Sequence, residues 1–267
     1  MTHNKSPQLN SQQLNYQQRG QGEHLLLIHG LFGSLENLNM VAKTLSQYYC
    51  VTSVDVRNHG SSFHQEGMSY SMLAQDVITL MNTLAIESCH VLGHSMGGKI
   101  AMQIALSNPE RVNKLAVADI APVKYPAHHL TIIEGLQAID LTKIKTRKDA
   151  SIQLTPYVEN VGVRQFLLRN LTQNEQGEFH FKCNLDYIAQ GYQQIMQGVE
   201  NTLQQSFKGD TLFIKGGDSD YILPEHQNAI KALFPEAKAK IIQGAGHWLH
   251  AEKTTSFNKI LIDFLSS

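Results

Sequence analysis

Ser95 stands in a glycine-rich setting, Gly93-His94-Ser95-Met96-Gly97-Gly98, that suits a serine nucleophile. An apolar run of strand length, Cys89 to Leu92, precedes the segment, and a run with helical character, Lys99 to Leu106, follows it. A G-x-S-x-G motif between a strand and a helix is typical of a nucleophile elbow, in which a strained turn exposes the hydroxyl. The two motif glycines leave room for neighbouring backbone. The segment therefore predicts that Ser95 attacks an electrophilic carbon.

A serine hydroxyl is a weak nucleophile at neutral pH and needs a general base. Of the thirteen histidines, His247 has the most suitable surroundings, Gly244-Ala245-Gly246-His247-Trp248, because the glycines let the chain fold down over a neighbour. The segment follows the last apolar strand, Ala239 to Ile242, and precedes a final helix from Thr254 to Leu265. His247 is therefore predicted at the same edge of the sheet as Ser95.

The base in turn needs an acid to orient it. Asp119 directly follows the apolar run Lys114 to Ala118, whereas Asp218 and Asp220 lie just beyond a later strand that includes Leu212 to Ile214. The common G-x-x-D pattern after that later strand falls on Ser219, not on an aspartate. We favour Asp119 as the acid, and Asp218 and Asp220 are the alternatives.

An oxyanion hole requires two backbone N–H groups. Met96, directly after the nucleophile, is predicted to supply one, and the loop His29 to Ser34 the other, with Leu31 favoured and Phe32 as the alternative. Asp55 to Ser62 is interpreted as a structural turn that supports this loop. Four residues are predicted to line the substrate pocket: Phe32, Phe166, Leu167 and Trp248.

The elements that must position these residues alternate between strand and helix over most of the chain. This alternation predicts a mostly parallel central sheet flanked by helices, and with the elbow it indicates an α/β-hydrolase fold. Residues 1–120 and 208–267 are assigned to the core domain. Helical patterns dominate residues 121–207, which are assigned to a cap inserted over the catalytic edge of the sheet. A second small domain with no part in catalysis is the alternative interpretation.

Composition narrows the function further. The formal net charge of the 267 residues is −1, which favours neither nucleic acid nor membrane insertion as a partner. The histidines and the three cysteines show no metal-binding spacing, so we expect no metal and no cofactor. Cys50 and Cys89 read as buried thiols of a reducing compartment, and the first twenty residues contain no apolar run of a secretory signal. We therefore expect a cytoplasmic protein, and we favour a monomer over an oligomer.

Several motifs together resemble a known family. The segments Gly93 to Gly98, Asp55 to Ser62, His29 to Ser34 and Gly244 to Glu252 resemble α/β-hydrolase fold esterases. More narrowly, Asp119-Ile-Ala-Pro-Val, Gly216-Gly-x-Ser-x-Tyr221 and Arg164-x-Phe-Leu-Leu-x-Asn-Leu171 resemble the bacterial YbfF esterases and their mitochondrial relatives. That resemblance implies an acid at Asp119 and hydrolysis of carboxylic esters, with acyl-CoA thioesters as a further substrate class.

The function expected from the sequence is therefore that of a serine carboxylesterase. It would hydrolyse short- to medium-chain acyl esters or thioesters of small molecules through an acyl-enzyme intermediate. A perhydrolase, a lactonase or a C–C bond hydrolase would use the same three side chains and is the alternative enzyme class. A ligand-binding protein without catalysis is the remaining alternative, because fold alone does not fix function.

Overall fold

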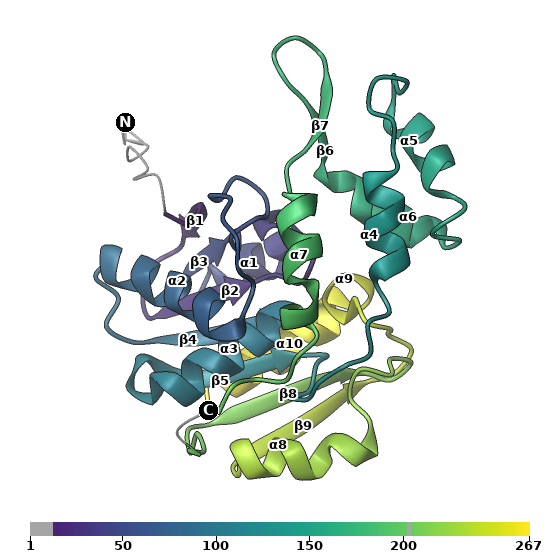
Figure 1. The fold of residues 1–267 in the computed structure, drawn as a ribbon. Helices are drawn as coiled ribbons and strands as arrows, with labels where there is room; N and C mark the ends of the chain where they lie inside the picture. Colours follow the sequence, from purple (N-terminus) through teal and green to yellow (C-terminus); the bar gives the residue numbers. More distant parts are fainter. Residues whose placement is uncertain (1–12, 202–203) are drawn as a thin grey trace, which may run out of the picture.

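The computed structural model describes residues 13–201 and 204–267 and contains a twisted seven-stranded sheet (Figure 1). The strand order is β1-β3-β2-β4-β5-β8-β9, and only β1 runs antiparallel to its neighbour. The strands are β1 (Tyr16–Arg19), β2 (His24–Ile28), β3 (Cys50–Val54), β4 (Cys89–His94), β5 (Val112–Ala118), β8 (Thr211–Gly216) and β9 (Ala237–Ile242).

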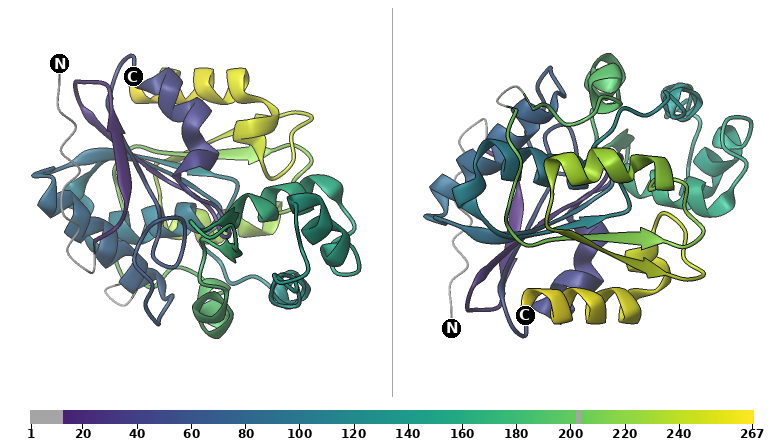
Figure 2. Two further views of the ribbon diagram at one scale, coloured as in Figure 1. Left: turned by 90° about the horizontal axis from the view of Figure 1, so that it is seen from above. Right: turned by 90° about the horizontal axis from the view of Figure 1, so that it is seen from below.

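Helices cover both faces of this sheet, as Figure 2 shows. One face packs against α1 (Asn39–Leu45), α9 (Leu249–Glu252) and α10 (Thr254–Leu265). The other face packs against α2 (Tyr70–Thr83), α3 (Met96–Ser107) and α8 (Gln227–Leu233). Short 3₁₀ turns occur at Leu35–Leu38, Pro109–Arg111, Leu168–Asn170 and Pro224–His226.

Burial on both faces explains why the central strands are rich in apolar residues. Every residue of β4 is buried, and the last four residues of both β2 and β5 are buried. A strand that is covered on both faces has no solvent-facing side, so its residues are mostly apolar and do not alternate between apolar and polar. The α/β-hydrolase architecture expected from the sequence is confirmed, and the carboxyl ends of β2, β4, β5, β8 and β9 share one edge of the sheet.

The segment between β5 and β8 forms a separate group of elements above that edge (Figure 1). Four helices and one hairpin make up this group, which we call the insertion: α4 (Leu130–Gln137), α5 (Arg147–Leu154), α6 (Val161–Leu167), α7 (Leu185–Ile195), β6 (Leu171–Gln173) and β7 (Phe179–Phe181).

The hairpin is absent from the sequence prediction for residues 121–207, in which helical patterns dominate. Local turn chemistry accounts for it. The Asn174 side-chain oxygen accepts the backbone N–H groups of Gln176 and Glu178, and Gly177 takes a φ of 80°. An asparagine that bonds its own following backbone, with glycine in the left-handed region, closes a tight turn between strands.

Smaller differences concern the amino-terminal part of the chain. The sequence pattern of Leu14 to Gln17 predicts a strand, but the first strand of the structure begins two residues later, at Tyr16, although Leu14 itself is buried. Cys89 is buried as expected, but Cys50 is only half-buried because it opens a strand at its exposed end. Residues 1–12, part of the stretch expected to lack a secretory signal, lie outside the described residues.

Backbone packs against backbone at the turn between β4 and α3. A Cβ on Gly97 would lie 2.2 Å from the carbonyl oxygen of Ile28 in β2, and one on Gly93 would lie 2.0 Å from the carbonyl oxygen of Gly97. Real Cβ atoms do not approach backbone this closely, so both positions require glycine. The turn that carries Ser95 is thereby pressed onto the neighbouring strand.

We expect Gly97→Ala to destabilise the protein by about 2 kcal/mol or more, because the new methyl group must displace backbone inside the sheet. Gly177→Ala, where no atom lies within 4 Å of an added Cβ, is the matched control. Its positive φ alone costs about 1 kcal/mol. Chemical denaturation of both variants measures the difference. Equal midpoints for the two would contradict the packing argument.

Candidate active site

Ser95 occupies a strained turn at the end of β4. Its φ of 54° and ψ of −122° lie outside the regions that residues with a Cβ favour. The backbone N–H of Ser95 donates to the carbonyl of Ala118, 2.9 Å away, which fixes the turn to the end of β5. The hydroxyl is left facing a cavity, at 3.0 Å from Nε2 of His247.

His247 lies between Ser95 and Asp119. Its Nδ1 is 2.8 Å from Oδ2 of Asp119, whose side chain is fully buried. The other carboxylate oxygen, Oδ1, accepts the backbone N–H of Gly216 at 2.9 Å. The Asp119 carboxylate can only accept, so Nδ1 of His247 carries the hydrogen of this bond. Nε2 is then without a hydrogen and can take the proton of the Ser95 hydroxyl. The structure thus brings the three side chains predicted from the sequence into one hydrogen-bonded chain.

The two alternative acids do not join this chain. Asp218 and Asp220 are exposed on the loop after β8, and only the residue between them turns inward. That residue, Ser219, donates its hydroxyl to Oδ2 of Asp119, the same oxygen that meets His247. Ser219 therefore stands where a G-x-x-D pattern would place the acid, and its hydroxyl donates a hydrogen bond to Asp119 at the end of the neighbouring strand, β5.

The loop after β2 lies directly against Ser95. A Cβ on Gly30 would lie 3.1 Å from Cβ of Ser95. The N–H of Phe32 donates to Nε2 of His59 at 3.1 Å, so this group is not available to an oxyanion. Within residues 13–201 and 204–267, neither the N–H of Leu31 nor that of Met96 has a protein acceptor. Of the two loop candidates, Leu31 is therefore the one with a free donor.

The Asp55 to Ser62 segment supports this loop from below, as the sequence interpretation expects. Asp55 accepts the N–H of Leu35 at 2.7 Å, and His29 accepts the N–H of Val56 at 3.0 Å through Nε2. Burial lowers the pKa of His59 to about 3 and also lowers that of His29. Both rings are therefore neutral, and a neutral imidazole can accept a backbone N–H.

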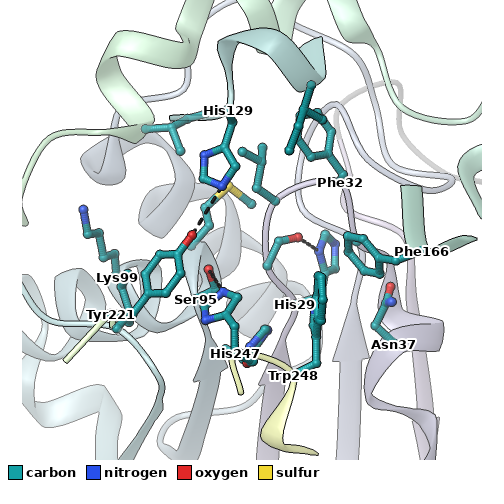
Figure 3. Close-up of a pocket in the computed structure, with 18 of the residues that line it drawn as sticks. His29, Phe32, Asn37, Ser95, Lys99, His129, Phe166, Tyr221, His247 and Trp248 are labelled. Atoms are coloured by element: carbon teal, nitrogen blue, oxygen red, sulfur yellow. Dashed lines mark hydrogen bonds between the residues drawn. The ribbon is translucent and has the colours of Figure 1, made fainter. Parts of the chain in front are cut away.

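A cavity of about 280 Å³ opens above Ser95 (Figure 3). All four residues predicted for the pocket line it: Phe32, Phe166, Leu167 and Trp248. The rings of Phe166 and Trp248 lie 5.4 Å apart, so an insertion helix meets the loop that carries His247. Of the other apolar insertion residues, Ile132 also lines the cavity, whereas Ile133, Leu136 and Ile188 pack into the core.

Sequence reasoning did not assign two further residues at the triad. The Tyr221 ring stacks on His247, with centroids 3.9 Å apart and planes 19° apart, and its hydroxyl lies 3.3 Å from Nε2 of His129 (Figure 3). Burial lowers the pKa of His129 to about 4, so this ring is neutral. Tyr221 could have been noticed, because it ends the motif Gly216-Gly-x-Ser-x-Tyr221. No sequence motif includes His129, which comes to lie over the site through the folding of the insertion.

Lys99 was also missed, and nothing in its apolar helix pointed to it. Its side chain is almost fully buried at the far side of the cavity, and Nζ donates to the carbonyl of Gln197 just beyond α7. The ring of Tyr125 lies 4.7 Å from Nζ. Burial lowers the pKa of Lys99 to about 7. The hydrogen bond from Lys99 ties α3, the helix that follows Ser95, to the end of the insertion.

Two further properties bear on ligands. In the described part of the chain, no group of three or more His, Cys, Asp or Glu side chains is arranged to hold a metal ion. No helix among the same residues is both long and apolar enough to span a bilayer.

Comparison with known proteins gives the class to which this fold and site belong. The model of the α/β-hydrolase fold family matches residues 23–254, and the chain belongs to this family. It is 39% identical to a mouse protein named sn-1-specific diacylglycerol lipase ABHD11, over 91% of this chain and 80% of that protein. It is 35% identical to esterase YbfF of Escherichia coli, over 93% of this chain and 97% of that protein.

A solved structure described as a marine microorganism esterase is also similar. It superposes with a TM-score of 0.91 at 40% identity, and the match covers 94% of this chain and 99% of the other. The resemblance to α/β-hydrolase esterases expected from the sequence is confirmed by these comparisons.

The hydrogen bonds around Asp119 predict the effect of removing its charge. Asp119→Asn should lower kcat by orders of magnitude, because an imidazolium formed at His247 would lose its buried counter-charge. The corresponding change in a chymotrypsin-type triad costs about 10⁴-fold, which sets the scale. Asp218→Asn and Asp220→Asn, on exposed side chains, are the controls and should change kcat little. A silent Asp119→Asn beside a crippling Asp220→Asn would show that the acid lies after β8.

Proposed function

We propose that this protein is a serine carboxylesterase that hydrolyses short- to medium-chain acyl esters through an acyl-enzyme intermediate. The hydrogen-bonded chain Ser95–His247–Asp119 beneath a largely apolar cavity is the observation that carries this proposal. Relatives named esterase and lipase at 35–39% identity support ester bonds as the substrate class.

In the first half of the proposed reaction, the Ser95 oxygen attacks the ester carbonyl while Nε2 of His247 accepts the hydroxyl proton. The carbonyl oxygen gains the negative charge, and the N–H groups of Leu31 and Met96 are our candidates to bind it. Asp119 stabilises the imidazolium. Collapse of the intermediate breaks the bond to the alcohol oxygen, which leaves with the proton from His247.

In the second half, water replaces the alcohol. His247 removes a proton from the water as the hydroxide attacks the acyl carbonyl, and the same two N–H groups bind the oxyanion again. Breakdown releases the carboxylic acid and returns the proton to Ser95. No redox partner or metal is needed for either half.

Residues 121–207 are proposed as a cap that shapes the acyl site, and residues 1–120 and 208–267 as the catalytic core. Phe166, Leu167 and Ile132 come from the insertion and contact the cavity. Acyl-CoA thioesters are a second proposed substrate class, since a thioester carbonyl reacts by the same steps. The name of the mouse relative adds diacylglycerols to the substrates worth testing. The free thiols of Cys89 and Cys183 support a reducing location such as the cytoplasm.

We expect a fluorophosphonate to label one serine stoichiometrically, Ser95, because its hydroxyl meets a histidine base beside the candidate oxyanion site. Intact-mass and peptide mass spectrometry would locate the label. Ser95→Ala should lose both labelling and esterase activity, whereas Ser107→Ala, at the end of the same helix, should keep both. Labelling that survives Ser95→Ala would refute the assignment of the nucleophile.

Acyl preference should depend on the insertion. Each methylene buried in the cavity contributes about 0.8 kcal/mol, so kcat/KM for p-nitrophenyl esters should rise about fourfold per carbon until the chain meets the cap. Phe166→Ala or Leu167→Ala should move the optimum toward longer chains while acetate esters are still hydrolysed.

Ile152→Ala, on the exposed face of α5, is the control for this series. It should leave the chain-length profile unchanged. A profile that no insertion variant shifts would mean that the insertion does not set acyl preference. Acyl-CoAs of the same lengths, run in parallel, would separate ester from thioester preference.

A further inference from the structure

The main chain around His247 is held at three points by two side chains that have no part in the proton transfers described above. The carbonyl oxygen of His247 lies 2.8 Å from Nε2 of His94. On either side of His247, the N–H of Gly246 donates to Glu252 Oε2 at 2.7 Å, and the N–H of Trp248 donates to Glu252 Oε1 at 3.3 Å. One carboxylate thus spans the residue that carries the base.

We propose that His94 and Glu252 are positioning residues that hold the backbone of His247 so that its ring meets Ser95 and Asp119 together. This inference rests on the proposed function, since it concerns the base of that reaction. Neither residue touches the reacting atoms in this account. They act by setting the position of the His247 imidazole.

His94 is suited to this task by its place in the chain. It is the last residue of β4 and directly precedes Ser95, so its bond to the His247 carbonyl links the base to the strand that carries the nucleophile. A carbonyl oxygen can only accept, so Nε2 of His94 carries the hydrogen. This hydrogen bond therefore fixes the tautomer of His94, and it also holds the loop that carries His247 at a set distance from the end of β4.

The charge state of His94 is equally important. Its ring centroid is 4.8 Å from that of His247 and 4.4 Å from that of His250. A charged His94 would repel the imidazolium that forms during catalysis. Burial holds the pKa of His94 well below its usual range and lowers that of His250 to about 4. Both rings are therefore neutral, and His94 can donate without opposing the charge on the base.

Glu252 acts from the opposite side of the loop. It is the last residue of α9, and its approach to the loop depends on Gly246, where an added Cβ would lie 3.3 Å from Oε1. The carbonyl of Gly246 in turn packs against Gly216 at the end of β8, where a Cβ would lie 2.2 Å away. The loop is thus confined between a carboxylate on one side and a strand end on the other. A displacement of the base by about 1 Å can cost about 10²-fold in rate.

The experiment compares variants that remove or keep each bond. His94→Leu removes the donor and should lower kcat about 10²-fold with little change in KM. His94→Gln can place an amide N–H near the position of Nε2 and should restore most of the loss. His90→Leu, an equally buried histidine four residues earlier on the same strand, is the control and should keep the wild-type kcat.

Glu252→Ala tests the second contact without disturbing the core, because the side chain is exposed. It should lower kcat and the rate of fluorophosphonate labelling together, whereas Asp263→Ala, on the exposed face of α10, should change neither. Thermal unfolding of all variants would measure stability separately. A kcat that follows stability alone, or equal losses for His94→Leu and His94→Gln, would overturn the proposal.

A double-mutant comparison completes the test. If His94 and Glu252 act through His247, then His94→Leu and Glu252→Ala should cause no further loss of the residual activity in a His247→Ala background. The same fold-loss in both backgrounds would overturn the inference while leaving the proposed function intact. A wild-type protein that is not labelled at Ser95 would instead overturn the proposed function, and this inference with it.

Discussion

The site depends on one buried charge, the carboxylate of Asp119. A carboxylate without access to water is stable only when its oxygens are fully hydrogen-bonded. Gly216, Ser219 and His247 provide the three bonds, and they come from the end of β8, from the loop after it and from the loop after β9. Because these donors must converge, the need to satisfy one side chain holds the end of β8 with its loop and the loop after β9 against the end of β5, at the same edge of the sheet.

Close backbone contacts make this convergence rigid. Gly97 packs against β2 and Gly216 against the His247 loop at distances that leave no space for a Cβ, and Gly30 lies tightly against Ser95. The neutral rings of His29 and His59 then complete the hydrogen bonds of the loop after β2. Such contacts hold the candidate oxyanion donors in place before any substrate arrives, which is the preorganisation that catalysis requires.

The insertion contributes the wall of the cavity and couples to the core through polar contacts. The hydroxyl of Tyr221 lies within hydrogen-bond distance of Nε2 of His129 (Figure 3), and Nζ of Lys99 donates to the carbonyl of Gln197 just beyond α7. Each contact joins an insertion segment to a core residue that lines the same cavity as Ser95 and His247. The shape of the cavity and the setting of the triad are therefore not independent, although they come from different parts of the chain.

The sequence by itself determined the architecture and singled out Ser95 and His247, and it favoured Asp119 as the acid while leaving Asp218 and Asp220 as alternatives. Periodicity and burial are local properties, so the strands and most helices could be located from apolar runs, and Ser95, His247 and Asp119 each carry a local signal at a strand end. Other features depend on contacts between residues far apart in sequence. Only the folded chain decided between Asp119 and the aspartates after β8, because burial and the bond to Ser219 distinguish them. The positions of His129 and Lys99 at the cavity, and the roles proposed for His94 and Glu252, likewise could not be predicted from the sequence. They depend on hydrogen bonds between residues far apart in the chain, which leave no pattern in a single sequence.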